Sequence, residues 1–163
     1  MSENTAILIR HSKAQNSSPG GDRSRKLSDS GLEQSRALAK KLADLVNEDA
    51  TILVSPATRA EETWGAIAQT LSLEDLVPKT VDEIYSGDAE DIVEVLRMEG
   101  RGKVTVIVGH EPTISAAAQR LAKPGQDVPW GVPTGTALVL QSDKDWKEWH
   151  PGVATLKDTV LTK

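Results

Sequence analysis

Basic side chains follow three short apolar or β-branched runs of this sequence. Arg10 and His11 come directly after the run AILI, and His110 comes directly after the run VTVIVG. Arg59 stands five residues after the end of a third run, TILV. Such runs are typical of strands buried on both faces of a parallel sheet, and ligands bind outside the carboxyl ends of those strands. We therefore expect the four side chains to meet at one edge of a sheet.

The types of these side chains favour binding of a phosphoryl group. An arginine presents a planar fork of N–H donors that matches phosphate oxygens. Helices that begin after Ser55 and after His110 would add further N–H donors and the positive end of the helix dipole. A histidine can accept a phosphoryl group when it is neutral, and nearby guanidinium groups lower its pKa and favour that form. The sequence therefore predicts a cationic pocket in which a histidine can act as a nucleophile.

Composition limits the other classes of function. The 163 residues, expected to form one domain over 1–163, carry a net charge of −5 and include no cysteine. The charge argues against nucleic-acid or membrane partners, and the lack of cysteine excludes disulfides and thiolate chemistry. The sequence has no HExxH, Walker A or GxGxxG motif, so no metal and no cofactor are expected. It has neither a membrane-spanning apolar run nor a signal peptide, so we expect a cytoplasmic protein; it does not indicate the oligomeric state.

Strand and helix patterns alternate along the chain. Strands are predicted over 6–9, 51–54, 103–109 and 136–141, and helices over 28–47, 58–71, 89–98 and 113–122. A short strand is expected near Val81, and 146–156 is expected to form an edge strand or hairpin. Trp130, Trp146 and Trp149 are expected to pack or to cover loops. The alternation predicts an α/β fold, a three-layer α/β/α sandwich around a mainly parallel sheet.

Four motifs in this order, IRHSKA, LVSPATRAEET, EIYSGD and IVGHEPT, resemble the histidine phosphatase superfamily, whose fold is phosphoglycerate mutase-like. Within it the RHSKA form and the short length are most similar to the SixA-type phosphohistidine phosphatases. The resemblance extends over about 6–140 and is specific, because each motif lies at a predicted element end. It implies a metal-independent phosphatase that works through a phosphohistidine intermediate. Its partner would be a phosphorylated protein or a small phosphate ester.

The resemblance also implies roles for single residues. His11 matches the nucleophile of the family, and Arg10 and Arg59 match its two phosphate-binding arginines. His110 matches the second histidine, which contacts the phosphate. Arg25 stands where many relatives have an arginine that shapes the pocket.

Three further positions carry less specific expectations. Ser17 lies in the loop where relatives often supply a polar phosphate contact. Ser12 replaces the usual glycine of the family, as in SixA-like members. Glu83 falls where phosphatases and mutases place the catalytic acid. Because a phosphoramidate leaving group needs no strong acid, Glu83 is either a proton donor to a leaving alcohol or a polar loop residue.

Several interpretations stay open at the level of the sequence. A chain without large insertions leaves the pocket shallow, which suits a phosphohistidine on another protein. A working acid at Glu83 would favour a phosphatase for small esters. A non-catalytic phosphate-binding interaction module on the same fold is the third reading, and the intact basic set argues against it. Arg59 could also pair with Glu61 or Glu62 on its own helix instead of binding a ligand.

Overall fold

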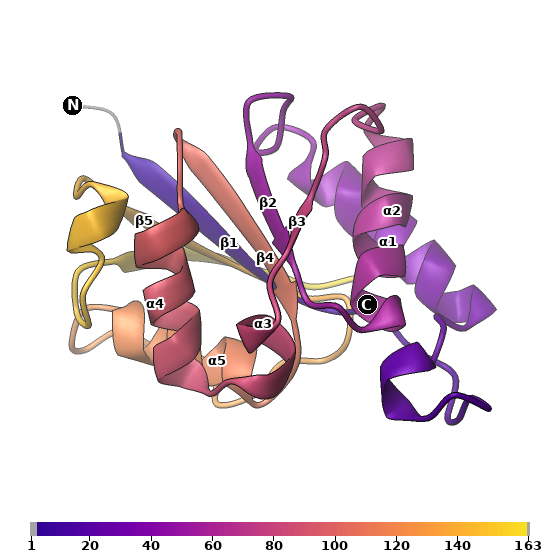
Figure 1. Cartoon of the computed structure of the whole chain (residues 1–163). Helices are drawn as coiled ribbons and strands as arrows, with labels where there is room; N and C mark the ends of the chain where they lie inside the picture. Colours follow the sequence, from indigo (N-terminus) through magenta and orange to yellow (C-terminus); the bar gives the residue numbers. More distant parts are fainter. Residues whose placement is uncertain (1–2, 163) are drawn as a thin grey trace.

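A six-stranded sheet lies at the centre of the computed structural model, which describes residues 3–162 (Figure 1). The strands are β1 (Asn4–Arg10), β2 (Thr51–Val54), β3 (Lys79–Thr80), β4 (Val104–Gly109), β5 (Ala137–Ser142) and β6 (Thr155–Val160). Their order across the sheet is β3-β2-β4-β1-β5-β6. Neighbours from β3 to β1 pair in parallel, and β5 pairs antiparallel with both β1 and β6. The mainly parallel sheet predicted from the sequence is confirmed.

Helices cover both faces of this sheet (Figure 1). They are α1 (Asp29–Leu42), α2 (Thr58–Thr70), α3 (Glu83–Ser86), α4 (Ala89–Glu99) and α5 (Thr113–Leu121), with 3-10 turns η1 (Asp22–Ser24) and η2 (Trp146–Glu148). Successive residues of a strand point to opposite faces. Ile7 and Ile9 accordingly join the core under α1 and α2, whereas Leu8 joins the core under α4 and α5. The three-layer arrangement is therefore confirmed.

Helix caps agree with the sequence at two places. The hydroxyl of Ser28 accepts a hydrogen bond from the N–H of Gly31 and begins α1. Asp88 and Asp91 form a reciprocal capping box at the start of α4, and Gly100 caps its C-terminus. Each cap satisfies backbone groups that a helix end leaves unpaired.

The first helix is shorter than expected. It ends at Leu42 rather than near Asn47, and a turn follows in which the N–H groups of Leu45 and Val46 both donate to the carbonyl of Leu42. The expected strand near Val81 is the two-residue β3, and the one-turn helix α3 follows it.

The segment 146–156 differs most from expectation. Its first part is the 3-10 turn η2, and the edge strand β6 does not begin until Thr155. Trp146 and Trp149 are both buried, with ring centroids 4.7 Å apart. A strand would send residues three apart to opposite faces, whereas a 3-10 turn brings them to the same side. Burial of both indoles against the core under α4 therefore favours the turn.

The order β2-β4-β1 places three strand ends beside one another. Arg10 is paired with Gly109, and Val54 is paired with Val108, so the residues that follow these strands leave the sheet at one edge. Within residues 3–162 no helix is long and apolar enough to cross a membrane.

Candidate active site

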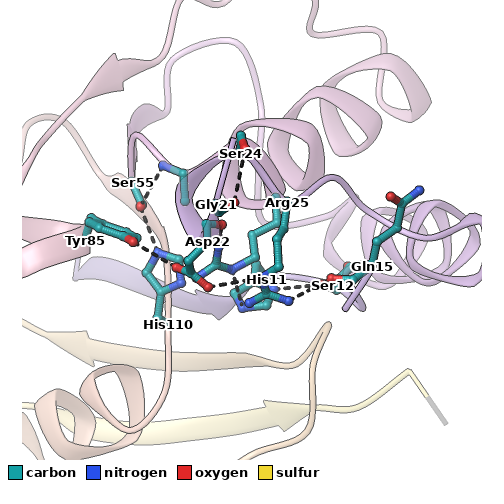
Figure 2. A network of polar contacts seen from close by, with 12 residues as sticks. His11, Ser12, Gln15, Gly21, Asp22, Ser24, Arg25, Ser55, Tyr85 and His110 are labelled. Atoms are coloured by element: carbon teal, nitrogen blue, oxygen red, sulfur yellow. Dashed lines mark hydrogen bonds and ion pairs between the residues drawn. The ribbon is translucent and has the colours of Figure 1, made fainter. Parts of the chain in front are cut away.

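His11 and His110 meet at this edge of the sheet (Figure 2). Their ring centroids are 5.2 Å apart, and the ring planes are inclined at 57°. Arg59, in the first turn of α2, is buried beside them, and its Nε–H lies 3.3 Å from Nε2 of His11. Three of the basic residues picked out in the sequence thus form one cluster although they are about a hundred positions apart.

The contacts of His11 determine which ring nitrogen carries its proton. Nδ1 lies 2.7 Å from the carbonyl oxygen of Ser12. A carbonyl only accepts hydrogen bonds, so Nδ1 is protonated and donates. In the neutral ring Nε2 then holds a lone pair, which accepts from Arg59. The nitrogen able to act as a nucleophile is therefore Nε2, on the side of the ring that faces the guanidinium group.

Burial keeps the His11 ring neutral. Loss of water around the ring, assisted by the charges of Arg59, Arg10 and Arg25, lowers the pKa of His11 to about 4. The hydrogen bond to the carbonyl of Ser12 opposes this shift but does not cancel it. At neutral pH the lone pair on Nε2 is therefore available.

His110 is held by residues from two other elements. Its Nε2 lies 2.8 Å from the hydroxyl of Ser55, which also accepts from the N–H of Ala57. The ring of Tyr85 packs against His110 edge to face, with centroids 5.5 Å apart. Burial, then the proximity of His11 and Arg59, lowers the pKa of His110 to about 3. Both histidines are therefore neutral in the folded protein.

We expect neither imidazole to titrate near its ordinary pKa of 6.5. The Cε1–H NMR resonances of His11 and His110, assigned with His11→Ala and His110→Gln variants, should keep their neutral shifts from pH 7.5 to pH 5. The physical reason is that burial penalises the charged ring. A midpoint near 6.5 for either resonance would contradict the buried arrangement described above.

The same shifts affect stability. Because the folded-state pKa values lie below 6.5, the unfolded chain binds more protons between pH 6.5 and pH 4. The free energy of unfolding contributed by these histidines therefore falls as the pH is lowered through that range.

Arg10 ends β1, and the segment before β5 holds its side chain. Nη1 donates to the carbonyl of Val132 at 2.8 Å, and the N–H of Val132 donates to the carboxylate of Glu111 at 2.9 Å. Nε of Arg10 and Nδ1 of His110 are buried without a hydrogen-bond partner among residues 3–162. Buried polar atoms are normally paired with protein, water or a ligand, so both atoms leave hydrogen-bonding capacity for a polar partner at this edge.

Ser12 lies beneath the cluster and is fully buried. Its N–H donates to the hydroxyl of Thr63 at 3.0 Å, and its own hydroxyl lies 2.7 Å from that of Ser35. These contacts connect the end of β1 to α2 and α1. They also give the buried hydroxyl of Ser12 a hydrogen-bond partner. At Gly31 a Cβ atom would collide with the carbonyl oxygen of Lys13, so only glycine permits α1 to start this close to the strand end.

Asp22 is a component of the site that the sequence did not single out. Its Oδ2 accepts hydrogen bonds from Nη2 of Arg59 at 3.2 Å and from the hydroxyl of Tyr85 at 2.8 Å. Its Oδ1 accepts from Nε of Arg25 at 3.0 Å. The hydrogen bond from Tyr85, followed by those from the arginines, lowers the pKa of Asp22 to about 2. Arg59 thus pairs with Asp22 rather than with Glu61 or Glu62.

Arg25 borders the cluster through Asp22, and its Nη1 also donates to the carbonyl of Gln15 at 2.8 Å. The side chain of Ser17 is exposed, and no hydrogen bond joins it to another residue within 3–162. A phosphate contact by either residue stays a prediction.

Glu83 lies on the other side of α3 from Tyr85. The two are two residues apart, which on a helix separates their directions by about 200°. Tyr85 packs on His110, whereas Glu83 is exposed and lines a hollow with Val95 and Met98 of α4. The geometry therefore gives no support to Glu83 as an acid at the two histidines.

The sequence held only weak signals for Asp22 and Tyr85. Asp22 stands three residues before Arg25, a spacing at which opposite charges can pair within one turn. Tyr85 is part of the EIYSGD motif. A helix of four residues has no periodicity from which its inward side could be predicted.

Trp130 is not packed in the core, so the expectation of packing is wrong for this residue. It borders a hollow of the loop over 124–128. Its side chain is exposed, with 87% of its area accessible, and it stands two residues before Val132, which holds Arg10. Within residues 3–162 no group of three or more His, Asp or Glu side chains is placed to hold a metal ion.

Comparison with known proteins supports one family. The histidine phosphatase superfamily (branch 1) matches residues 6–98. No curated protein sequence matches the chain. A structure from Agrobacterium tumefaciens, described as a proposed phosphohistidine phosphatase SixA, is 26% identical with a TM-score of 0.78, over 96% of this chain and 97% of that one.

Two other solved structures share the fold. A proposed phosphohistidine phosphatase SixA from Nakamurella multipartitia has a TM-score of 0.82 at 22% identity, over 98% of this chain and 96% of that one. The protein histidine phosphatase SixA complexed with tungstate has a TM-score of 0.81 at 23% identity, over 97% of each chain. With the sequence match over more than half of its length, the chain belongs to the histidine phosphatase superfamily, branch 1.

Proposed function

We propose that this protein is a metal-independent phosphatase that forms a phosphohistidine intermediate on His11, and that its substrate is a phosphohistidine on another protein. The observation that carries the proposal is the state of His11. Its proton is held on Nδ1 by the carbonyl of Ser12, and the lone pair of Nε2 faces Arg59. A neutral, oriented imidazole beside guanidinium groups is suited to attack on a phosphoryl group.

In the first step Nε2 of His11 attacks phosphorus in line with the leaving nitrogen. The Nε2–P bond forms while the P–N bond of the substrate breaks, and the departing imidazole, already protonated on its other ring nitrogen, keeps the electron pair of the broken bond and leaves as the neutral ring. Arg10 and Arg59 bind the phosphoryl oxygens and neutralise the charge that spreads over them. The Nε–H of Arg59 turns from the lone pair of His11 to an oxygen, and the unpaired Nε of Arg10 gains a partner.

In the second step water attacks phosphorus and the Nε2–P bond breaks. Phosphate leaves, and His11 returns to its neutral form with the proton still on Nδ1. The phosphorylated ring carries a positive charge, which the carbonyl of Ser12 stabilises through the Nδ1–H hydrogen bond at 2.7 Å. We expect His110, which Ser55 holds with its ring centroid 5.2 Å from that of His11, to contact the phosphoryl group as well.

Trp130 favours a protein substrate over a small ester. Trp130 belongs to the segment whose Val132 carbonyl holds Arg10, and its exposed side chain borders a hollow with Gln119 and Lys123. An exposed indole on this segment can anchor a protein surface, whereas a small ligand at Arg10 and His11 has no surface to meet it. Tryptophan is among the residue types that contribute most to protein–protein affinity. The position of Glu83, away from both histidines, also favours a leaving group that needs no strong acid.

A comparison of two substrates with the same P–N bond tests this assignment. We expect Trp130→Ala to lower kcat/KM roughly tenfold for a protein phosphorylated on histidine, since it removes an interface anchor. Hydrolysis of phosphoramidate should change less than twofold, because that small substrate has no surface to dock.

Val77→Ala provides the matched control, since Val77 is another exposed hydrophobic side chain. Equal losses on both substrates would contradict a docking role for Trp130. Faster turnover of sugar phosphates than of the phosphoprotein, with a loss in Glu83→Gln, would instead establish a small-ester phosphatase.

A further inference from the structure

The carboxylate of Asp22 occupies the hydrogen-bond donors that a phosphoryl group would use. Arg59 donates to it from Nη2, Arg25 donates from Nε, and Tyr85 donates from its hydroxyl. Figure 2 shows this carboxylate beside His110 and Tyr85, at the centre of the polar network. Carboxylates and phosphates are recognised by the same guanidinium geometry, so the two anions compete for these donors.

Asp22 lies on the solvent side of the buried guanidinium group. The side chain of Arg59 is 7% exposed, whereas that of Asp22 is 53% exposed. An anion that approaches Arg59 from solvent therefore meets the carboxylate first. Because the hydrogen bond from Tyr85 and the two arginines keep the pKa of Asp22 near 2, the carboxylate is charged throughout the range in which the protein would work.

We propose that Asp22 is an internal competitor of substrate and product oxyanions for Arg59 and Arg25, and that it limits how tightly the site retains phosphate. This inference rests on the proposed function, because it assigns the anion pocket to a phosphoryl group. Its consequence is release of product: a pocket with several cationic groups would otherwise hold inorganic phosphate strongly.

The main chain holds Arg59 independently of the carboxylate. The carbonyl oxygen of Asp22 accepts from Nη1 of Arg59 at 2.8 Å. The turn around Asp22 is also tied by the hydroxyls of Ser18 and Ser24, which lie 2.9 Å apart, and by the bond from Arg25 to Gln15. Replacing the carboxylate with a neutral amide of the same shape therefore removes the charge and leaves the guanidinium group in place.

Calorimetric titration with inorganic phosphate at pH 8 and constant ionic strength tests this. Asp22→Asn should tighten the Kd for phosphate roughly tenfold, the size expected for one charge a few ångströms from a dianion in partly screened surroundings. Product inhibition by phosphate should strengthen by the same factor. The control Asp82→Asn makes the same change of charge at an 81% exposed side chain and should change the Kd less than twofold.

Equal or weaker phosphate binding by Asp22→Asn would overturn the inference and show that the carboxylate positions Arg59. Asp22→Ser, a smaller neutral replacement, should shift the Kd for phosphate in the same direction. It replaces Asp22→Asn in the test if the asparagine variant does not fold. Arg59→Ala should abolish binding in both backgrounds, which locates the phosphate. If neither wild type nor Asp22→Asn binds phosphate, the anion pocket itself is wrong and the proposed function falls with it.

Discussion

Replacing His11 with alanine should abolish turnover and leave the fold intact. In the proposed mechanism the variant loses Nε2, the atom that forms the bond to phosphorus, and loss of a nucleophile lowers kcat by roughly four orders of magnitude or more. Stability should fall by only about 1–3 kcal/mol, because the carbonyl of Ser12 loses one hydrogen-bond donor. Steady-state hydrolysis of phosphoramidate and of a histidine-phosphorylated protein measures the first effect, and thermal unfolding measures the second.

The third histidine of the chain is the natural control. His150 is exposed and lies 4.0 Å from Glu148, so His150→Ala should retain the activity of the wild type. Rapid quenching with labelled substrate should trap phosphate on the wild-type protein and on His150→Ala, but not on His11→Ala. Retained turnover in His11→Ala would refute the assignment of the nucleophile, and failure to trap phosphate on wild type would favour the non-catalytic binding module.

Arg59→Ala should lower kcat/KM by roughly 10²- to 10³-fold, as removal of a positioned donor to a developing anion does. Arg59 contacts His11, the proposed nucleophile, directly and carries a charge close to where the transferred oxygens would lie. Arg59→Lys should recover only part of the loss, because an ammonium group keeps the charge but cannot donate as a planar fork. The measurement is kcat/KM on phosphoramidate, so that contacts of a protein substrate do not enter.

Arg120→Ala removes an exposed arginine that pairs with Glu90, away from the two histidines, and should behave as wild type. Addition of guanidinium ion to Arg59→Ala should restore part of the rate if loss of the donor, and not a change of fold, causes the defect. If kcat/KM of Arg59→Ala equals that of the wild type, this arginine serves only to bind Asp22.

The contrast between Glu83 and Tyr85 shows where prediction from the sequence stops. Both residues belong to one motif, and the resemblance left Glu83 open between a proton donor and a polar loop residue. The structure turns Tyr85 toward His110 and Glu83 toward α4. Because α3 has a single turn, its orientation about its own axis depends on packing against α4 and β4. The sequence of so short a helix does not predict that orientation.

The sequence alone determined strands β1, β2, β4 and β5, most helix ends and the residues that follow the strand ends, because runs of apolar residues and helix caps act over a few neighbouring positions. Those local rules, together with the order expected of a parallel sheet, were enough to select Arg10, His11, Arg59 and His110. Only the tertiary structure decided that Asp22 accepts hydrogen bonds from Arg25 and Tyr85 beside these four residues. The hydrogen bond between Asp22 and Tyr85 joins residues 63 positions apart, and such a contact exists only once both loops pack beside the same sheet edge.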